Sequence, residues 1–200
     1  MNITAQEVLL GLFNPEDTVN LRVFADRRDD NFTGTKLSIE CGKYATIEKL
    51  LKKHNEAKRG IFFVVNSGGQ DDASITRINA QFVEMDNCSF EEQQKKIDAF
   101  PLAPSMIIKT RKSLHTYWFM KNAEVAKFRP LQRRLVDYFA GDPMCVNESR
   151  VMRLPGFYHT KEEPVMVECI LFHPERKYTQ EQLSEVLPGH VEVEEEEQHG

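Results

Sequence analysis

The longest uninterrupted apolar run in the sequence is only five residues long, Ile61 to Val65. A helix that spans a membrane needs about 20 apolar residues, so the sequence predicts no membrane span. A short apolar run, here within residues 60–66, is typical of a strand that is buried on both of its faces. The chain must therefore place other elements on both sides of this strand, and its 200 residues are enough to do so in one domain.

Hydrophobic periodicity indicates the elements around this strand. Alternating patterns predict strands at residues 18–25, 36–41, 80–86, 105–109, 114–120 and 165–172. Helical patterns cover residues 3–13, 47–55, 90–100 and 128–139, with Pro130 in a first turn and a last helix that begins at Thr179. The polar turn 110–113 joins two of the strands as a hairpin. Hairpins among interleaved strands and helices favour a mixed α+β fold over a purely parallel sheet.

Charge is unevenly distributed along the chain. The formal net charge is −5, and five glutamates lie in the last ten residues, which we expect to be a disordered acidic tail over 191–200. Residues 109–134 hold eight basic residues and one acid, Glu124. Such a basic surface on a neutral body fits an anionic partner that is contacted over a limited area, although a solvated helix face has the same pattern.

The four cysteines lie far apart, at positions 41, 88, 145 and 169. Their spacing matches neither a zinc knuckle nor a redox motif, so we expect buried thiols in a reducing compartment. The first residues carry no basic stretch before a long apolar one, which is unlike a secretory signal. The sequence therefore predicts an intracellular protein.

The segment FVEMD places two acids on one predicted strand, Glu84 and Asp86. Residues two apart on a strand face the same side, so these carboxylates project together while Val83 and Met85 pack on the other side. Neighbouring carboxylates repel each other unless a cation lies between them, and Mg²⁺ or Mn²⁺ prefers such oxygen ligands. The alternative is an edge strand with two solvated acids.

A second group of polar residues surrounds the predicted hairpin turn. Ser113 and His115 share one face of the second strand, next to the basic residues Lys109, Arg111 and Lys112. A histidine in this setting can donate a hydrogen bond to phosphate. A single histidine is also common as a satisfied structural residue.

Two further groups follow the helix predicted at 128–139. Asp142 in the sequence GDP is either a turn-capping residue or a third metal ligand. Arg150 and Arg153 come before a Pro-Gly turn, and His159 and Lys161 follow closely as further potential donors. Two guanidinium groups held in this way suit phosphate or carboxylate, whereas the alternative is a surface loop with scattered charge.

Taken in order, FVEMD, SLH, Asp142 and RVMRLPGFYHTK resemble the motifs of the archaeo-eukaryotic primase (AEP) superfamily, in particular the primase-polymerases of phages and plasmids. The resemblance covers roughly residues 60–172. It departs from the family pattern at Glu84, where aspartate is more common, and this changes the reach of one metal ligand. It implies a catalytic domain over 1–190, with an N-terminal subregion (1–60) and a motif-bearing core (60–175) that has an RRM-like antiparallel sheet.

The resemblance also implies an activity: template-directed transfer of a nucleotide from NTP or dNTP to a 3′-hydroxyl. It implies two divalent ions, Mg²⁺ or Mn²⁺, on Glu84, Asp86 and Asp142. Further residues would bind the nucleotide, namely Ser113, His115, Arg150, Arg153, Lys109 and Lys161. Arg111 and Lys112 would contact nucleic acid, and the expected partners are a single-stranded DNA template with its primer and a helicase domain or protein.

Two other functions fit parts of the pattern. A non-catalytic nucleic-acid-binding domain would use the exposed aromatic residues of an RRM-like sheet to stack bases. A rolling-circle replication nuclease would need a His-hydrophobic-His pair, but Tyr117 stands two residues after His115.

Overall fold

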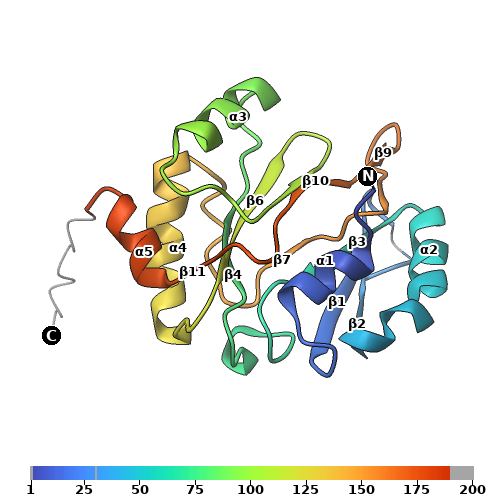
Figure 1. The fold of residues 1–200 in the computed structure, drawn as a ribbon. Helices are drawn as coiled ribbons and strands as arrows, with labels where there is room; N and C mark the ends of the chain where they lie inside the picture. Colours follow the sequence, from blue (N-terminus) through green and yellow to red (C-terminus); the bar gives the residue numbers. More distant parts are fainter. Residues whose placement is uncertain (1, 30, 190–200) are drawn as a thin grey trace, which may run out of the picture.

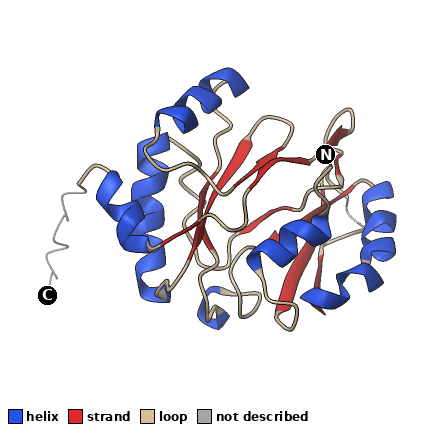
Figure 2. Ribbon diagram, in the orientation of Figure 1, coloured by secondary structure: helices blue, strands red, loops and turns tan. Residues whose placement is uncertain are grey.

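Two β-sheets with helices packed on them form the part of the chain that the computed structural model describes, residues 2–29 and 31–189 (Figures 1 and 2). The first sheet has the strand order β2-β1-β3-β7. Its strands are β1 (Thr18–Ala25), β2 (Thr35–Glu40), β3 (Arg59–Val64) and β7 (Val151–Arg153), and all their pairings are antiparallel. The first sheet thus joins the N-terminal part of the chain to the RVMR motif.

The second sheet is built around β6 (Leu114–Met120), which pairs with three other strands. Strands β4 (Ala80–Val83) and β5 (Met106–Lys109) are antiparallel to it, and β11 (Lys177–Tyr178) is parallel to it. Strand β10 (Glu168–Phe172) extends the sheet beyond β5. A separate small hairpin joins β8 (Tyr158–His159) to β9 (Val165–Met166). The predicted α+β fold with an antiparallel sheet that carries the FVEMD motif is confirmed.

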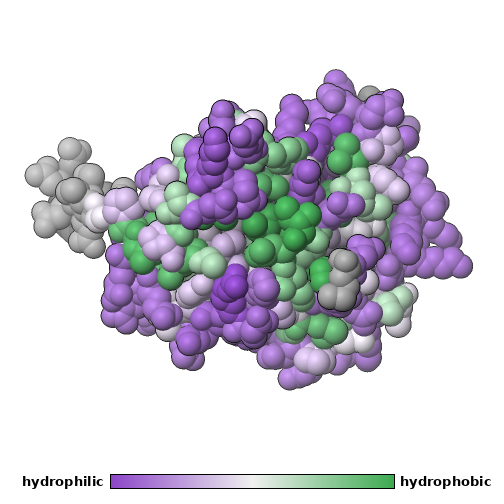
Figure 3. All heavy atoms as spheres, turned by 45° about the horizontal axis from the view of Figure 1, so that its top comes forward, coloured by the Kyte–Doolittle hydropathy of each residue, from purple (hydrophilic) through white to green (hydrophobic). Residues whose placement is uncertain are grey.

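The helices divide between the two sheets (Figure 1). Helices α3 (Phe90–Ala99), α4 (Val125–Phe139) and α5 (Gln180–Val186) lie on the side of the second sheet. Helices α1 (Ala5–Leu12) and α2 (Glu48–Glu56) lie on the side of the first, with short 3₁₀ turns at Cys41–Thr46 and Asp72–Ser74. The outer surface is mostly hydrophilic in Figure 3, with apolar side chains gathered near the middle of that face. No helix of the described residues is long and apolar enough to cross a membrane.

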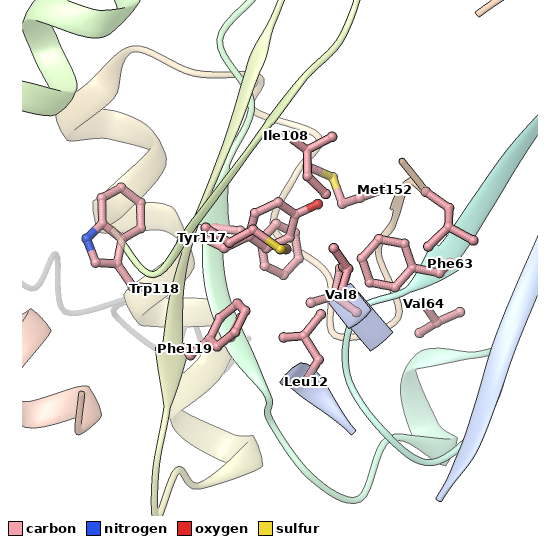
Figure 4. Packing of buried hydrophobic residues seen from close by; sticks show 14 of the residues in the cluster. Val8, Leu12, Phe63, Val64, Ile108, Tyr117, Trp118, Phe119 and Met152 are labelled. Carbon is pink, nitrogen blue, oxygen red and sulfur yellow. The ribbon is translucent and has the colours of Figure 1, made fainter. Parts of the chain in front are cut away.

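Strand β6 is buried on both faces and supplies much of the core. Tyr117 points toward Phe63 and Met152 of the first sheet, whereas Trp118 points the other way (Figure 4). The Trp118 ring packs against Phe100 and Phe139, and its Nε1 donates a hydrogen bond to the carbonyl of Leu102 at 3.0 Å. The alternation of β6 therefore fills two separate interfaces, one between the sheets and one under the helices.

Two predicted elements differ from those in the structure. Helix α4 begins at Val125, because Gln180 Oε1 accepts a hydrogen bond from the Glu124 amide and fixes an earlier start. Pro130 consequently lies inside the helix and not in its first turn. The strand predicted at 165–172 is split at Val167, whose amide donates to the Phe157 carbonyl at 3.0 Å. The capping box at Thr179 is confirmed, and the predicted acidic tail lies outside the described residues.

The edge of β4 that faces away from β6 is satisfied by a side chain. Gln132 of α4 is fully buried, and its amide binds both backbone groups of Phe82. Its Oε1 accepts from the Phe82 amide at 3.2 Å, and its Nε2 donates to the Phe82 carbonyl at 2.6 Å and to the Cys145 carbonyl at 2.9 Å. Gln132 therefore replaces a neighbouring strand and fixes β4 just before it reaches Glu84.

The Gln132→Leu variant tests this role. It leaves the buried amide and carbonyl of Phe82 without partners, and each such group costs roughly 1–3 kcal/mol. We expect the free energy of unfolding, measured by urea denaturation, to fall by about 2–4 kcal/mol. The matched control is Gln94→Leu on α3, whose amide makes only an exposed hydrogen bond to Asp98, so the free energy of unfolding should change by no more than about 0.5 kcal/mol. Equal stability of the two variants would contradict the role given to Gln132.

Candidate active site

A cleft of about 510 Å³ lies where the two sheets meet, and residues from both sheets line it. The FVEMD motif and the turn before β6 contribute one wall, and the ends of β1, β3 and β7 contribute the other. Nine of the eleven site residues predicted from the sequence line this cleft: Glu84, Asp86, Arg111, Lys112, Ser113, His115, Arg150, Arg153 and Lys161. The structure thus brings together motifs that lie far apart along the chain.

The two acids of FVEMD follow directly after β4, which ends at Val83 and is shorter than predicted. Their alternation still holds, because Val83 and Met85 are fully buried while Glu84 and Asp86 line the cleft. The Met85 amide donates to Ser113 Oγ at 3.0 Å. Ser113 therefore fastens the acidic segment to the start of β6, next to His115.

Glu84 lies between two basic side chains. Its Oε1 is 3.5 Å from His115 Nε2, and its Oε2 is 3.8 Å from Arg150 Nη2. Burial alone would raise the pKa of Glu84, but His115 and then Arg150 outweigh it and lower this pKa to about 2. Glu84 is therefore a carboxylate at neutral pH.

Asp142 is tied to the same segment by its backbone and by Arg150. Its amide donates to the Glu84 carbonyl at 2.8 Å, and its Oδ2 is 3.3 Å from Arg150 Nη2. This close approach to the end of β4 needs glycine at position 141. A Cβ there would lie only 2.6 Å from the Val83 side chain. Asp142 does not itself line the cleft, and Arg150 lies between its carboxylate and that of Glu84.

Arg153 is held by a buried acid that the sequence did not reveal as a site residue, Asp26. The Asp26 side chain is only 2% exposed, and its Oδ1 accepts from Arg153 Nη2 at 2.9 Å. Its Oδ2 accepts from the amide and the hydroxyl of Thr160 at 2.8 and 3.0 Å. A Cβ on Gly60 would lie 2.7 Å from both Asp26 Oδ1 and Arg153 Nη1, so glycine leaves the room for this pair.

The remaining basic residues divide into two groups. Arg111 Nη2 donates to the His159 carbonyl at 3.1 Å, and both residues line the cleft together with Lys112 and Lys161. Lys109 lies outside the cleft, with its ammonium group 4.6 Å from the centre of the Phe90 ring. The structure therefore separates Lys109 from the other predicted nucleotide-binding residues.

Several cleft residues were not expected from the sequence: Phe24, Asp26 and Phe62. His159, a potential donor in the sequence, also lines the cleft. Burial and then Arg153 lower the pKa of His159 to about 4, so this side chain is neutral at neutral pH. Asp26 follows directly after a predicted strand, which is the only signal that the sequence offers for it. To predict that Phe24 and Phe62 line the cleft, one must know how their strands pair, and the sequence does not show this register.

The donor set of the cleft is chemically suited to a divalent cation. Glu84 and Asp86 present carboxylate oxygens, and Mg²⁺ is commonly held by one or two carboxylates together with water and substrate phosphates. Within residues 2–29 and 31–189, no group of three or more His, Cys, Asp or Glu side chains is arranged to hold a metal by itself. The acids therefore fit an ion that is completed by a phosphate ligand.

The cleft also contains several buried nitrogen atoms that lack hydrogen-bond partners. Four cleft residues have a buried nitrogen without a hydrogen bond to any described residue: Arg111 and Arg150 at Nε, and His115 and His159 at Nδ1. Buried polar atoms of this kind are rare in folded proteins. The two arginine Nε–H groups among them are donors, as a ligand that is rich in acceptor oxygens would require.

Comparison with known proteins agrees with this chemistry. The profile of the family described as RepB DNA-primase N-terminal domain matches residues 72–195. Among solved structures, the AEP domain of the cyanophage S-2L primase-polymerase (PrimPol) superposes with a TM-score of 0.77 and 29% identity, covering 90% of this chain and 95% of that one. No protein of curated function matches the sequence.

Two structures of primase RepB′ share the fold at lower identity. One superposes with a TM-score of 0.64 and 14% identity, over 90% of this chain and 62% of that one. The other is its catalytic domain in complex with initiator DNA, with a TM-score of 0.64 and 13% identity, over 92% of this chain and 95% of that one. The fold is therefore that of the AEP domains of primases and primase-polymerases.

The chain belongs to the RepB DNA-primase N-terminal domain family, because that profile covers more than half of it. The predicted membership in the phage and plasmid branch of the AEP superfamily is thereby confirmed.

Replacing Asp26 by Asn tests the buried ion pair. Burial opposes ionisation, but Arg153 and Thr160 outweigh it and lower the pKa of Asp26. Its stabilising effect is therefore full above the unfolded pKa of about 3.9 and is lost as the pH falls through the folded pKa. In urea denaturation we expect Asp26→Asn to cost about 3 kcal/mol at neutral pH, and less at about pH 3.

The control for this experiment is Asp98→Asn on α3, an exposed acid that should leave stability within about 0.5 kcal/mol of wild type. If the loss of stability caused by Asp26→Asn stays constant as the pH falls, the charge of the Asp26 carboxylate does not stabilise its contacts with Arg153 and Thr160.

Proposed function

We propose that the protein is a DNA primase-polymerase that transfers a nucleotide from NTP or dNTP to a 3′-hydroxyl on a DNA template. The observation that carries this proposal is the opposition of two carboxylates and a set of basic side chains across one cleft. The membership in a DNA-primase family agrees with it. We assign the activity to a catalytic domain over residues 1–190, with the motif-bearing core at 60–175.

Glu84 and Asp86 would hold the divalent cations, Mg²⁺ or Mn²⁺. Glu84 remains ionised because its pKa is about 2, so it offers a charged ligand at neutral pH. Bound cations supply a lower pKa for the attacking hydroxyl and stabilise charge on the leaving pyrophosphate. Asp142 is the third ligand expected from the family resemblance, and its carboxylate is paired with Arg150.

The basic side chains would receive the triphosphate. His115 is almost fully buried beside Glu84, and its position fits a hydrogen bond to a phosphate oxygen next to the metal ligands. Arg150 and Arg153 enter from the other sheet and add charge-assisted donors. Lys161, Arg111 and Lys112 would attract nucleotide and DNA backbone, while the position of Lys109 outside the cleft favours a peripheral role.

The partners follow from the same assignment. A single-stranded DNA template with its primer is the polymeric substrate, in agreement with the complex that primase RepB′ forms with initiator DNA. Binding should be salt-sensitive, because the contacts are largely between basic side chains and phosphate. A helicase domain or protein is the further partner expected for a replication primase of this kind.

The double variant Glu84→Gln, Asp86→Asn tests the metal ligands. It keeps the shape of both side chains and removes their charge, so primer extension on single-stranded DNA should fall at least about 100-fold with either Mg²⁺ or Mn²⁺. Circular dichroism should show a folded protein. The control is Glu91→Gln with Asp98→Asn on α3, which should extend primers as wild type does.

Extension at the wild-type rate by the Glu84 and Asp86 double variant would refute the assignment. If wild type itself fails to extend with both metals but binds oligonucleotide, the chain is a nucleic-acid-binding module and not a polymerase.

Replacing His115 by Ala tests the triphosphate contact. We expect the KM for dNTP to rise about tenfold, the effect of one lost charge-assisted hydrogen bond, while the affinity for primed DNA changes little. Steady-state extension and fluorescence anisotropy measure the two quantities. The control is His173→Ala, a partly exposed histidine that does not line the cleft. An equal loss in both quantities would move His115 out of the triphosphate site.

A further inference from the structure

The face of the first sheet that continues from the cleft carries a row of basic and aromatic side chains. Lys36 is opposite Arg22 in the strand register, Arg22 is opposite Phe62, and Phe62 is opposite Arg153. Residues directly opposite each other in antiparallel strands share a face. The row therefore runs across all four strands, from exposed Lys36 at one edge to the cleft at the other.

Phe24 stands beside this row and is an unusually open aromatic residue. It follows Arg22 by two positions, so it shares the same face of β1, and its side chain is 37% exposed and lines the cleft. Its ring meets Phe62 edge to face, with centroids 5.4 Å apart at 69°. The Arg153 guanidinium lies over Phe62 at 4.6 Å from the ring centre. The pair thus forms an aromatic wall that is supported from behind and open to the cleft at Phe24.

The charges on this face suit a polyanion. Arg22 is held in place by Gln70, whose Oε1 accepts from Arg22 Nε at 3.1 Å and whose backbone carbonyl accepts from Nη2. Glu40 lies on the same face but pairs with Lys43 at 3.1 Å, and Asp26 is neutralised by Arg153. Neither of these two acids is therefore paired with Arg22 or Lys36.

We propose that Phe24, supported by Phe62, stacks an unpaired base of single-stranded DNA, while Arg22 and Lys36 contact the backbone of the same strand. This inference rests on the proposed function, since it locates the path of the template. A purine or pyrimidine ring suits an open phenyl face, and aromatic residues interleaved with basic ones are typical of single-strand binding surfaces. The row reaches away from the acids along the sheet, which suits a strand better than a single nucleotide.

The test is binding without metal or nucleotide, so that it does not depend on catalysis. The probe is a fluorescein-labelled oligo(dT) of about 12 nucleotides, compared with an oligomer of equal length made of abasic sites. Phe24→Ala should weaken oligo(dT) binding about 5- to 150-fold, the range for one lost base stack, and leave the abasic oligomer nearly unaffected. Lys36→Gln should weaken both to a similar extent, because it removes a phosphate contact.

Two further variants at position 24 distinguish the loss of base stacking from a loss of folding. Phe24→Leu keeps apolar packing on Phe62 but removes the aromatic face, so it should show the same selective loss, while Phe24→Trp should bind at least as tightly as wild type. The matched control is Tyr138→Ala on α4, an aromatic residue that is 38% exposed but lies outside the cleft. It should bind both oligomers as wild type does.

A separate titration with dATP distinguishes a strand base from a nucleotide base. Unchanged dATP affinity in Phe24→Ala, together with the selective loss of oligo(dT), supports the template assignment. Wild-type oligo(dT) binding by Phe24→Leu, or a loss confined to dATP, would overturn it. Failure of primer extension with intact, Phe24-dependent oligo(dT) binding would refute the polymerase activity but not the stacking site.

Discussion

The cleft depends on one buried carboxylate, that of Asp26, because it joins the N-terminal sheet to the segment that carries most of the basic groups. One oxygen binds Arg153 and the other binds Thr160, so a single side chain holds both ends of the 153–160 turn. Gly60 makes room for this contact on β3. With both oxygens occupied, the desolvation of the carboxylate is offset, and Arg153 is held at a fixed place over Phe62.

On the opposite wall of the cleft, acidic and basic side chains form ion pairs with one another. Glu84 is flanked by His115 and Arg150, and Arg150 also reaches Asp142. His115 and Arg150 lower the pKa of Glu84 and so keep this one carboxylate ionised in a partly buried place. The network thus pairs opposite charges at the place where we propose that cations and phosphates bind.

Much of this could be predicted from the sequence because it depends on local patterns. Alternation placed Glu84 and Asp86 on one side of Val83 and Met85, and it brought Ser113 and His115 to one face. The roles of Asp26 and Phe24 could not be predicted, because they depend on β7 pairing with β3, which lies some 90 residues earlier in the chain. The early start of α4 similarly depends on Gln180, a partner that no local pattern reveals.

The two sheets also differ in what they can offer a nucleic acid. On β6, the aromatic residues Tyr117, Trp118 and Phe119 are buried on both faces, and Phe82 on the adjacent strand is buried as well. The central strands β4 and β6 of the sheet that carries the acidic motif therefore present no open aromatic ring for base stacking in the manner of an RNA-binding sheet. The open aromatic residue of the cleft lies instead on the first sheet, at Phe24. The proposed base contact therefore lies on the wall opposite Glu84 and Asp86, beside the arginines Arg150 and Arg153 that we propose to hold the triphosphate, so strand and nucleotide would meet within one cleft.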